Sequence, residues 1–275
     1  MAIDYKEKAR LARLKVLKMI HEAGTSHIAS NFSVIDIATV LFENLKKEDE
    51  VVWSKGWVAA TIYYFLAQQG KIPKEDLDLF GKEIEDTHPP GECSTFSPKI
   101  IKYLGLVETT TPGIWANAGS MGHGLPIACG MALAKKLKGE PGIIYCIMSD
   151  GEMNEGTTWE SAMFAAHHKL DNLVVIVDKN KWQAMGKCEE VLDININYAF
   201  AGFQWASLEI EGHDFESLHG CFTHQWRQDA ADKPKAVICN TIKGEGVSFM
   251  RDHLIFHYRH VDEENYKLAK AELEA

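Results

Sequence analysis

The sequence has 275 residues, a formal net charge of −10 and 46% hydrophobic residues, a composition that excludes disordered and fibrous classes. Its acidic balance, with a pI of about 5.6, argues against non-specific binding to nucleic acid or to an anionic membrane. No run of 18 apolar residues is present, so we expect no transmembrane segment. The cysteines are scattered without a CxxC pair, and we therefore expect reduced thiols and a cytoplasmic location.

Hydrophobic periodicity predicts a helix over residues 5–22, where Leu11, Leu14 and Leu17 recur at helical spacing. Further helices are predicted at 34–45, 58–69, 125–137, 157–168, 214–229 and 262–273. Short apolar runs predict buried strands at 143–148, 173–178, 207–210 and 236–241. Because strands and helices alternate in the second half, we predict an α/β fold with a parallel sheet flanked by helices on both faces.

The segment 82–118 differs from the rest of the chain because it has little periodicity and is rich in proline. A long irregular stretch inside a compact domain is usually a functional loop or a lid. We therefore interpret residues 1–275 as a single domain that carries one long functional loop.

Polar residues follow two of the predicted strands. Asp150-Gly151 comes directly after strand 143–148, and Asn180 comes after strand 173–178. Adjacent strands lie roughly 5 Å apart, so both side-chain oxygens can reach one cation. Carboxylate and amide oxygens favour Mg²⁺ or Ca²⁺ over zinc. The competing interpretation is that Asp150 caps helix 157–168 and that Asn180 lies in an ordinary turn.

The stretch GSMGHG at 119–124 has the glycine content of a dinucleotide-binding loop. That fingerprint needs a strand directly before it and the spacing GxGxxG. Residues 113–118 make a poor strand, and the glycines here follow GxxGxG instead. We therefore reject a dinucleotide fold.

Together these stretches resemble the N-terminal half of a transketolase. Asp150-Gly151 followed after a strand by Asn180 is similar to the thiamine-diphosphate motif. Supporting matches occur in order along the chain: SKG at 54–56, TPG at 111–113, GSMGHG at 119–124, AAHHKLDNL at 165–173, EGHDF at 211–215 and TIKGEGVSFM at 241–250. The resemblance runs from about residue 10 to the end of the sequence.

The resemblance implies roles for individual residues. Mg²⁺ (or Ca²⁺) would be held by Asp150, Asn180 and the main-chain carbonyl of Trp182. His27 and His257 would lie near the diphosphate, the substrate and the thiazolium ring, and Glu155 would lie at a dimer interface that links two active sites. These three are the implied catalytic residues. The implied cofactor-binding residues are Gly119, Ser120, Met121, Gly151, Glu152, Asn180, Lys243 and His27.

The resemblance also implies that this chain carries half of an active site. A transketolase has a second, pyrimidine-binding domain, and we find no candidate for it after Met250. The expected protein is the N-terminal subunit of a split transketolase, paired with a C-terminal subunit in an α₂β₂ particle. Its expected reaction transfers a two-carbon ketol unit from a ketose to an aldehyde.

Two other interpretations stay open. One is the alpha-type subunit of another thiamine-diphosphate enzyme, either a 2-oxo-acid decarboxylase or dehydrogenase or a deoxyxylulose-phosphate synthase. The other is a divergent, non-catalytic assembly subunit. The latter is motivated by Trp57 and Leu106, which stand where the family usually has histidine, whereas His123 stands where glutamine is common. Recognition of substrate hydroxyls depends on correctly positioned hydrogen-bond donors. We therefore expect the substrate of this chain to differ from that of a family member with histidines at these positions.

Overall fold

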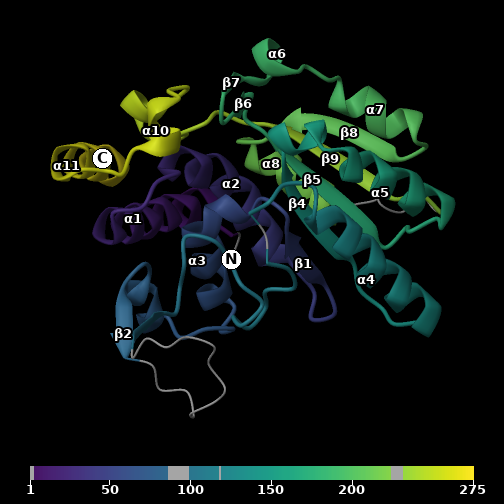
Figure 1. The fold of residues 1–275 in the computed structure, drawn as a ribbon, viewed down its shortest axis with the longest axis horizontal. Helices are drawn as coiled ribbons and strands as arrows, with labels where there is room; N and C mark the ends of the chain where they lie inside the picture. The colour runs from purple at the N-terminus through teal and green to yellow at the C-terminus, as the bar shows by residue number, and fades with distance from the viewer. Residues whose placement is uncertain (1–2, 86–98, 118, 224–231) are drawn as a thin grey trace.

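The computed structural model describes residues 3–85, 99–117, 119–223 and 232–275 (Figure 1). Its main sheet has five strands: β1 (Glu50–Trp53), β4 (Ile144–Ser149), β5 (Leu173–Lys179), β8 (Ala206–Glu211) and β9 (Lys235–Asn240). The strands lie in the order β1-β4-β5-β9-β8, and every neighbouring pair is parallel. The predicted α/β fold with a parallel sheet is therefore confirmed.

Successive residues of the central strands alternate between two hydrophobic cores, one on each face of the sheet. Ile147 and Ile176 belong to the first core, whereas Met148 and Val175 belong to the second. Because both faces are buried, the middle of each of these strands is a continuous apolar run, without the polar alternation of a half-exposed sheet. This is why they are recognisable in the sequence.

Helices cover both cores (Figure 1). The first core is covered by α1 (Tyr5–Ala23), α2 (Ile28–Asn44), α3 (Ala59–Gln68), α8 (Phe215–Thr223) and α11 (Glu263–Glu274). The second is covered by α4 (Gly124–Lys138), α5 (Gly156–His167) and α7 (Ile196–Gly202). Shorter elements are α6 (Cys188–Val191), α10 (Ile255–Tyr258) and the antiparallel pairs β2 (Glu83–Glu85) with β3 (Lys99–Ile101) and β6 (Trp182–Gln183) with β7 (Gly186–Lys187).

The junction between α1 and α2 places a histidine at the edge of the sheet. Helix α1 ends at Gly24, whose φ of 62° is left-handed. The chain then enters α2 through His27, which also has a left-handed φ of 70°. This conformation costs a non-glycine residue about 1–2 kcal/mol. It is held by the His27 N–H, which donates to the His257 carbonyl at 3.2 Å, and by the His27 carbonyl, which accepts from Asn31.

The register of the sheet brings distant segments together. Ser149 of β4 is paired with Asp178 of β5, and Asp178 is paired with Cys239 of β9. All three strands run in the same direction, so the segments that follow them leave the sheet at one edge. The carboxyl edge is where ligands bind in open parallel sheets.

The structure differs from the predicted elements in three places. Helix α2 begins at Ile28 and not at 34, because residues 28–33 are buried on all sides and show no helical polar–apolar period. Strand β1 was not predicted, since it has only four residues and lies at the edge of the sheet. Part of the segment 82–118 is not irregular, because it forms β2 and β3. Residues 86–98 and 118, and the predicted helix end at 224–229, lie outside the described residues.

Among the described residues, no helix is both long enough and apolar enough to cross a membrane.

Candidate active site

A cavity of about 310 Å³ lies at the carboxyl edge of the sheet. Its walls come from the α1–α2 junction, the segment after β1, the glycine-rich turn 119–124, the ends of β4 and β5, and α10. The lining residues are His27, Ser30, Ser54, Lys55, Gly56, Trp57, Gly119, Met121, Ser149, Gly151, Asn180, Trp182, Gln183, Ala184, His257 and Tyr258.

The predicted metal ligands lie together at this edge. Asp150 follows β4 and is 4% exposed, and Asn180 follows β5 and is 2% exposed. The Asp150 carboxylate accepts from the backbone N–H groups of Gly151 and Lys181, and the Asn180 side-chain oxygen accepts from the Trp182 N–H at 3.1 Å. Asp150 therefore does not cap α5, which begins after Glu155.

The charge of Asp150 is not balanced by an ion pair within the described part of the chain. Burial and the neighbouring charge of Asp178 raise the pKa of Asp150 to about 6. A bound cation would reverse this effect, because an opposite charge favours the ionised carboxylate. A buried carboxylate beside a buried amide thus fits a hard divalent cation such as Mg²⁺.

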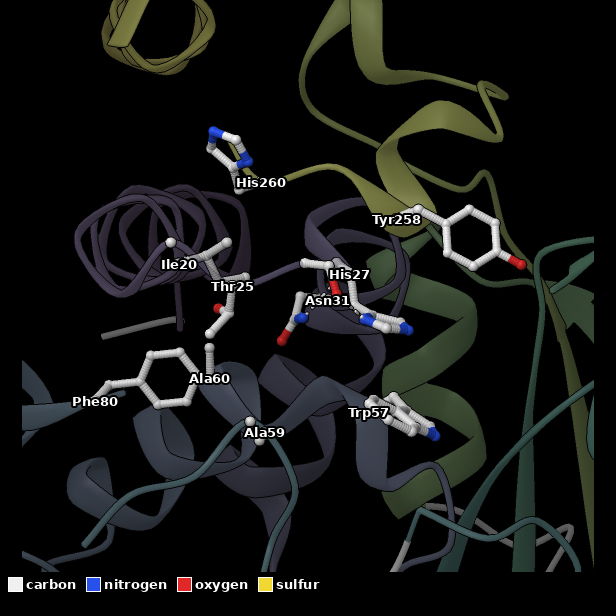
Figure 2. Close-up of a pocket in the computed structure, with 13 residues that line it drawn as sticks. Ile20, Thr25, His27, Asn31, Trp57, Ala59, Ala60, Phe80, Tyr258 and His260 are labelled. Atoms are coloured by element: carbon white, nitrogen blue, oxygen red, sulfur yellow. Dashed lines mark hydrogen bonds between the residues drawn. The ribbon is translucent and has the colours of Figure 1, made fainter. Parts of the chain in front are cut away.

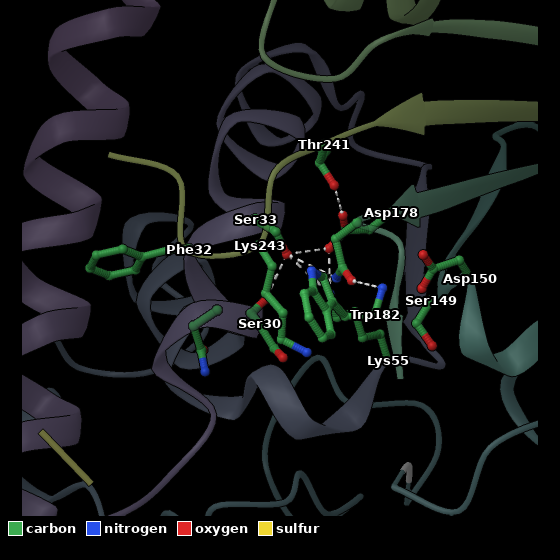
Figure 3. Close-up of polar contacts among 12 residues, drawn as sticks. Ser30, Phe32, Ser33, Lys55, Ser149, Asp150, Asp178, Trp182, Thr241 and Lys243 are labelled. Atoms are coloured by element: carbon green, nitrogen blue, oxygen red, sulfur yellow. Dashed lines mark hydrogen bonds and ion pairs between the residues drawn. The ribbon is translucent and has the colours of Figure 1, made fainter. Parts of the chain in front are cut away.

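Lys55, which lines the cavity, belongs to a buried ion pair that the sequence analysis missed (Figure 3). Lys55 contacts Asp178 through a short ionic hydrogen bond, and both side chains are almost completely buried. Asp178 also accepts hydrogen bonds from the hydroxyls of Ser33 and Thr241. Although burial opposes it, the positive charge of Lys55 keeps the pKa of Asp178 below its ordinary value. This cluster ties β5 to α2 and to the end of β9.

Two histidines form one wall of the cavity. The rings of His27 and His257 lie 4.7 Å apart, and the Lys243 ammonium lies 2.7 Å from His257 Nδ1. Burial, reinforced by the charge of Lys243, lowers the pKa of His27 to about 4 and that of His257 to about 3. Burial also lowers the pKa of Lys243 to about 8. Both imidazoles are therefore neutral near pH 7.

Trp57 lines this cavity and also a second cavity of about 380 Å³, which is shown in Figure 2. Its ring stacks on His27 with centroids 4.8 Å apart, and its indole N–H donates to the Gly119 carbonyl at 2.8 Å. Its side chain is 44% exposed. Leu106, the other residue in place of a histidine, packs against Gly119, where an added Cβ would lie 2.7 Å from it.

The buried carboxylate of Glu152 holds the turn 119–124 in place. Glu152 accepts hydrogen bonds from the Ser54 hydroxyl and from the Gly122 N–H. The Ser54 hydroxyl in turn accepts from the Gly124 N–H at 3.0 Å. Gly122 has a left-handed φ of 80°. The turn therefore has a fixed shape that holds Met121 against the cavity.

The structure thus brings only some of the predicted site residues to the cavity. Lining it are His27, Gly119, Met121, Gly151, Asn180, Trp182 and His257, with Asp150 and Lys243 packed directly behind. Ser120, Glu152 and Glu155 do not line it, and neither does His123, which is exposed at the start of α4. The Glu152 carboxylate accepts a hydrogen bond from the Gly122 N–H of the turn, and Glu155, which precedes α5, lies next to Gly122.

Lining residues that the sequence analysis missed include Lys55 and Tyr258. Lys55 lies within the SKG stretch, two residues after the end of β1, so correct assignment of that strand would have placed it at this edge. Tyr258 gives no comparable signal, because its position depends on α10 folding back over the cavity, where its hydroxyl donates to the Ala184 carbonyl.

The fold and the site together define an α/β domain of the thiamine-diphosphate-binding class. Residues 5–274 match the family described as "Transketolase, thiamine diphosphate binding domain". The chain belongs to this transketolase family.

Its relatives include separate subunits. The chain is 32% identical to a 6-deoxy-6-sulfo-D-fructose transketolase subunit from Clostridium sp., over 99% of this chain and 97% of the relative. It is also 32% identical to one of the apulose-4-phosphate transketolase subunits from Actinobacillus succinogenes, over 98% of this chain and 95% of the relative. These relatives indicate a split transketolase.

A longer transketolase has the same fold. The crystal structure of transketolase from Campylobacter jejuni superposes on the whole of this chain with a TM-score of 0.84 and 26% identity. This chain spans 43% of that longer one.

Proposed function

We propose that this chain is the N-terminal subunit of a split transketolase that depends on thiamine diphosphate and Mg²⁺. With a partner subunit it transfers a two-carbon ketol unit from a ketose, or a ketose phosphate, to an aldehyde. The observation that carries the proposal is the cavity at the carboxyl edge of the sheet. Asn180, Gly151 and two neutral histidines face this cavity, and the buried Asp150 lies directly behind it.

Mg²⁺ would be held by Asp150, Asn180 and the main-chain carbonyl of Trp182. Gly151 would let the backbone approach the diphosphate because it has no side chain, and an added Cβ would lie only 3.0 Å from the Cβ of Gln183. When bound, the cofactor supplies a stabilised carbanion to accept and release the ketol unit. Glu152 supports the turn that carries Met121 and is a positioning residue in this proposal.

The histidines would orient the substrate through the free Nε2 atoms of neutral imidazoles. The Lys243 ammonium can only donate, so Nδ1 of His257 accepts and its proton lies on Nε2. Nδ1 of His27 lies 2.6 Å from the Ser26 hydroxyl, which leaves its Nε2 for a ligand. The Nε2–H of His257 can donate to a sugar hydroxyl or carbonyl oxygen, and Nε2 of His27 can donate to or accept from a sugar hydroxyl. Trp57, whose side chain lines both cavities, is the residue we expect to set the choice of donor.

The partner would supply the pyrimidine-binding domain, in an α₂β₂ particle of the cytoplasm. Support comes from the relatives, two of which are named as transketolase subunits and align along nearly their full length. Their names differ in the sugar, one a 6-deoxy-6-sulfo-fructose and the other apulose 4-phosphate. The ketose donor of this chain must therefore be identified by a screen of ketoses. Glu155, outside the cavity and half-buried, is our candidate for a contact between subunits.

Cofactor binding tests the proposal most simply. The complex with its partner is titrated with thiamine diphosphate and Mg²⁺ in a calorimeter, as the unchanged protein and as Asp150→Asn. Loss of a charge-assisted contact of about 1.5–3 kcal/mol predicts a roughly 10- to 150-fold weaker affinity. The control is Asp171→Asn, since Asp171 is paired with the exposed Lys136 at the opposite end of β5. Equal affinities for the unchanged protein and Asp150→Asn would refute the proposed metal site.

The product distinguishes the remaining interpretations. A transketolase conserves the carbon of its ketose and aldehyde substrates, whereas a 2-oxo-acid decarboxylase or a deoxyxylulose-phosphate synthase releases CO₂ from pyruvate. Ketol transfer without CO₂ release would support the proposal. CO₂ release from pyruvate would favour the second enzyme class, and cofactor-free assembly without turnover would favour a non-catalytic role.

A further inference from the structure

A buried network of three charged or ionisable side chains lies outside the cofactor cavity. Arg13 of α1 makes two hydrogen bonds of 2.8 Å to the two carboxylate oxygens of Asp36 in α2. His213, between β8 and α8, lies 2.7 Å from the same carboxylate through Nδ1. The side chains of Arg13, Asp36 and His213 are 8%, 4% and 21% exposed. We call these residues the Arg13–Asp36–His213 network.

The hydrogen bonds fix the tautomer of His213. Its Nε2 lies 2.8 Å from the backbone nitrogen of Ile242, which can only donate. Nε2 is therefore the acceptor, and the ring proton lies on Nδ1, directed at Asp36. The ring thus links a buried carboxylate to one backbone N–H of the segment after β9.

The same network holds the other end of that segment. Arg13 Nε donates to the carbonyl of Glu245 at 3.0 Å. Between these two anchors, the Gly244 N–H donates to the Ala29 carbonyl in the first turn of α2. The short segment 242–245 is therefore fixed at both ends by residues that bind Asp36. Within this segment, Lys243 is the residue whose side chain reaches the candidate site.

Lys243 connects the network to the cavity. Its side chain is almost completely buried, and its ammonium contacts Nδ1 of His257, which lines the cavity. A lysine side chain has several rotatable bonds, so its terminal position depends on how firmly its backbone is held. Arg13, Asp36 and His213 do not themselves line the cavity.

We propose that the Arg13–Asp36–His213 network is a positioning device for Lys243, and through it for the protonation state and orientation of His257. This inference rests on the proposed function only in taking His257 as a substrate-facing residue. Arg13, Asp36 and His213 are positioning residues and not catalytic ones.

The direct test observes His257 by nitrogen NMR of the histidine-labelled complex with its partner. His213→Leu removes the acceptor for Ile242 and is expected to shift the His257 Nδ1 and Nε2 resonances in the same direction as Lys243→Met. His213→Gln places an oxygen near the former Nε2 position and is expected to restore part of the change. Trp205→Phe, which removes one buried hydrogen bond on the other face of the sheet, is the matched control and is expected to leave His257 unchanged.

A kinetic cycle tests the same link. We expect His213→Leu to lower kcat roughly 2- to 30-fold with little change in KM. Combined with Lys243→Met it should cause almost no further loss, whereas Trp205→Phe should act independently of Lys243→Met. Unchanged His257 resonances in a folded His213→Leu protein, or fully additive losses in kcat, would overturn the proposal. Shifted resonances in a complex without ketol transfer would refute the proposed function and leave the positioning role intact.

Discussion

In the Lys55–Asp178 pair, the charge of Lys55 stabilises the buried, ionised carboxylate of Asp178. In Lys55→Met, the side-chain hydrogen-bond donors that remain for Asp178 among the described residues are the hydroxyls of Ser33 and Thr241. Removing one partner of a buried ion pair typically costs about 3–5 kcal/mol, because the remaining charge stays desolvated. We therefore expect the free energy of unfolding in urea to fall by about that amount.

The matched double variant Lys55→Met/Asp178→Asn removes both charges and should recover most of the loss. A single variant as stable as the unchanged protein would contradict the burial of an ionised Asp178.

The neutral histidines predict how stability depends on pH. The pKa values of about 4 for His27 and about 3 for His257 lie below the ordinary value of 6.5. Between pH 6.5 and about 4 the unfolded chain binds protons that the folded chain does not, so stability falls as the pH falls. His27→Gln/His257→Gln should flatten this part of the curve.

Urea midpoints at pH 7 and pH 5 measure the effect. Equal pH dependence in the double variant and the unchanged protein would show that these rings are not buried in neutral form.

At the scale of elements, the turn 119–124 links the sheet to α4 and α5. An added Cβ on Gly122 would lie 2.4 Å from the Thr157 hydroxyl, at a φ of 80° that disfavours other residues. Gly122→Ala is thus expected to lose about 1–2 kcal/mol from the backbone alone, and to weaken thiamine-diphosphate binding by displacing Met121.

Gly130→Ala is the control, because Gly130 lies within α4 with nothing near its Cβ position. It should stabilise the protein by about 0.5–1 kcal/mol. Thermal unfolding and cofactor titration of both variants check the prediction, and equal effects of the two changes would contradict it.

Elements with a clear pattern were predictable from the sequence, and elements that depend on tertiary contacts were not. The strands β4, β5 and β9 are apolar runs buried on both faces, and they place Asp150 and Asn180 at one edge. Strand β1 is too short to show a pattern, and without it Lys55 had no predicted place. The anchoring of the turn by Glu152 could not be predicted either, because it joins residues far apart in sequence.

At the scale of the whole molecule, the central claim is that this chain carries one half of a shared active site. The cavity contains the groups proposed to bind the diphosphate and metal, and it opens beside exposed side chains such as Trp57 and Tyr258. A partner that covers this edge would bury these rings and complete the site. Activity should then require both chains.

The most direct test is a native mass spectrum of this chain purified from its own cells in the presence of thiamine diphosphate and Mg²⁺. We predict a complex that contains two copies of this chain, two copies of a second polypeptide and bound cofactor, with the cofactor lost in Asp150→Ala. A particle made of this chain alone, with no cofactor bound, would contradict the account.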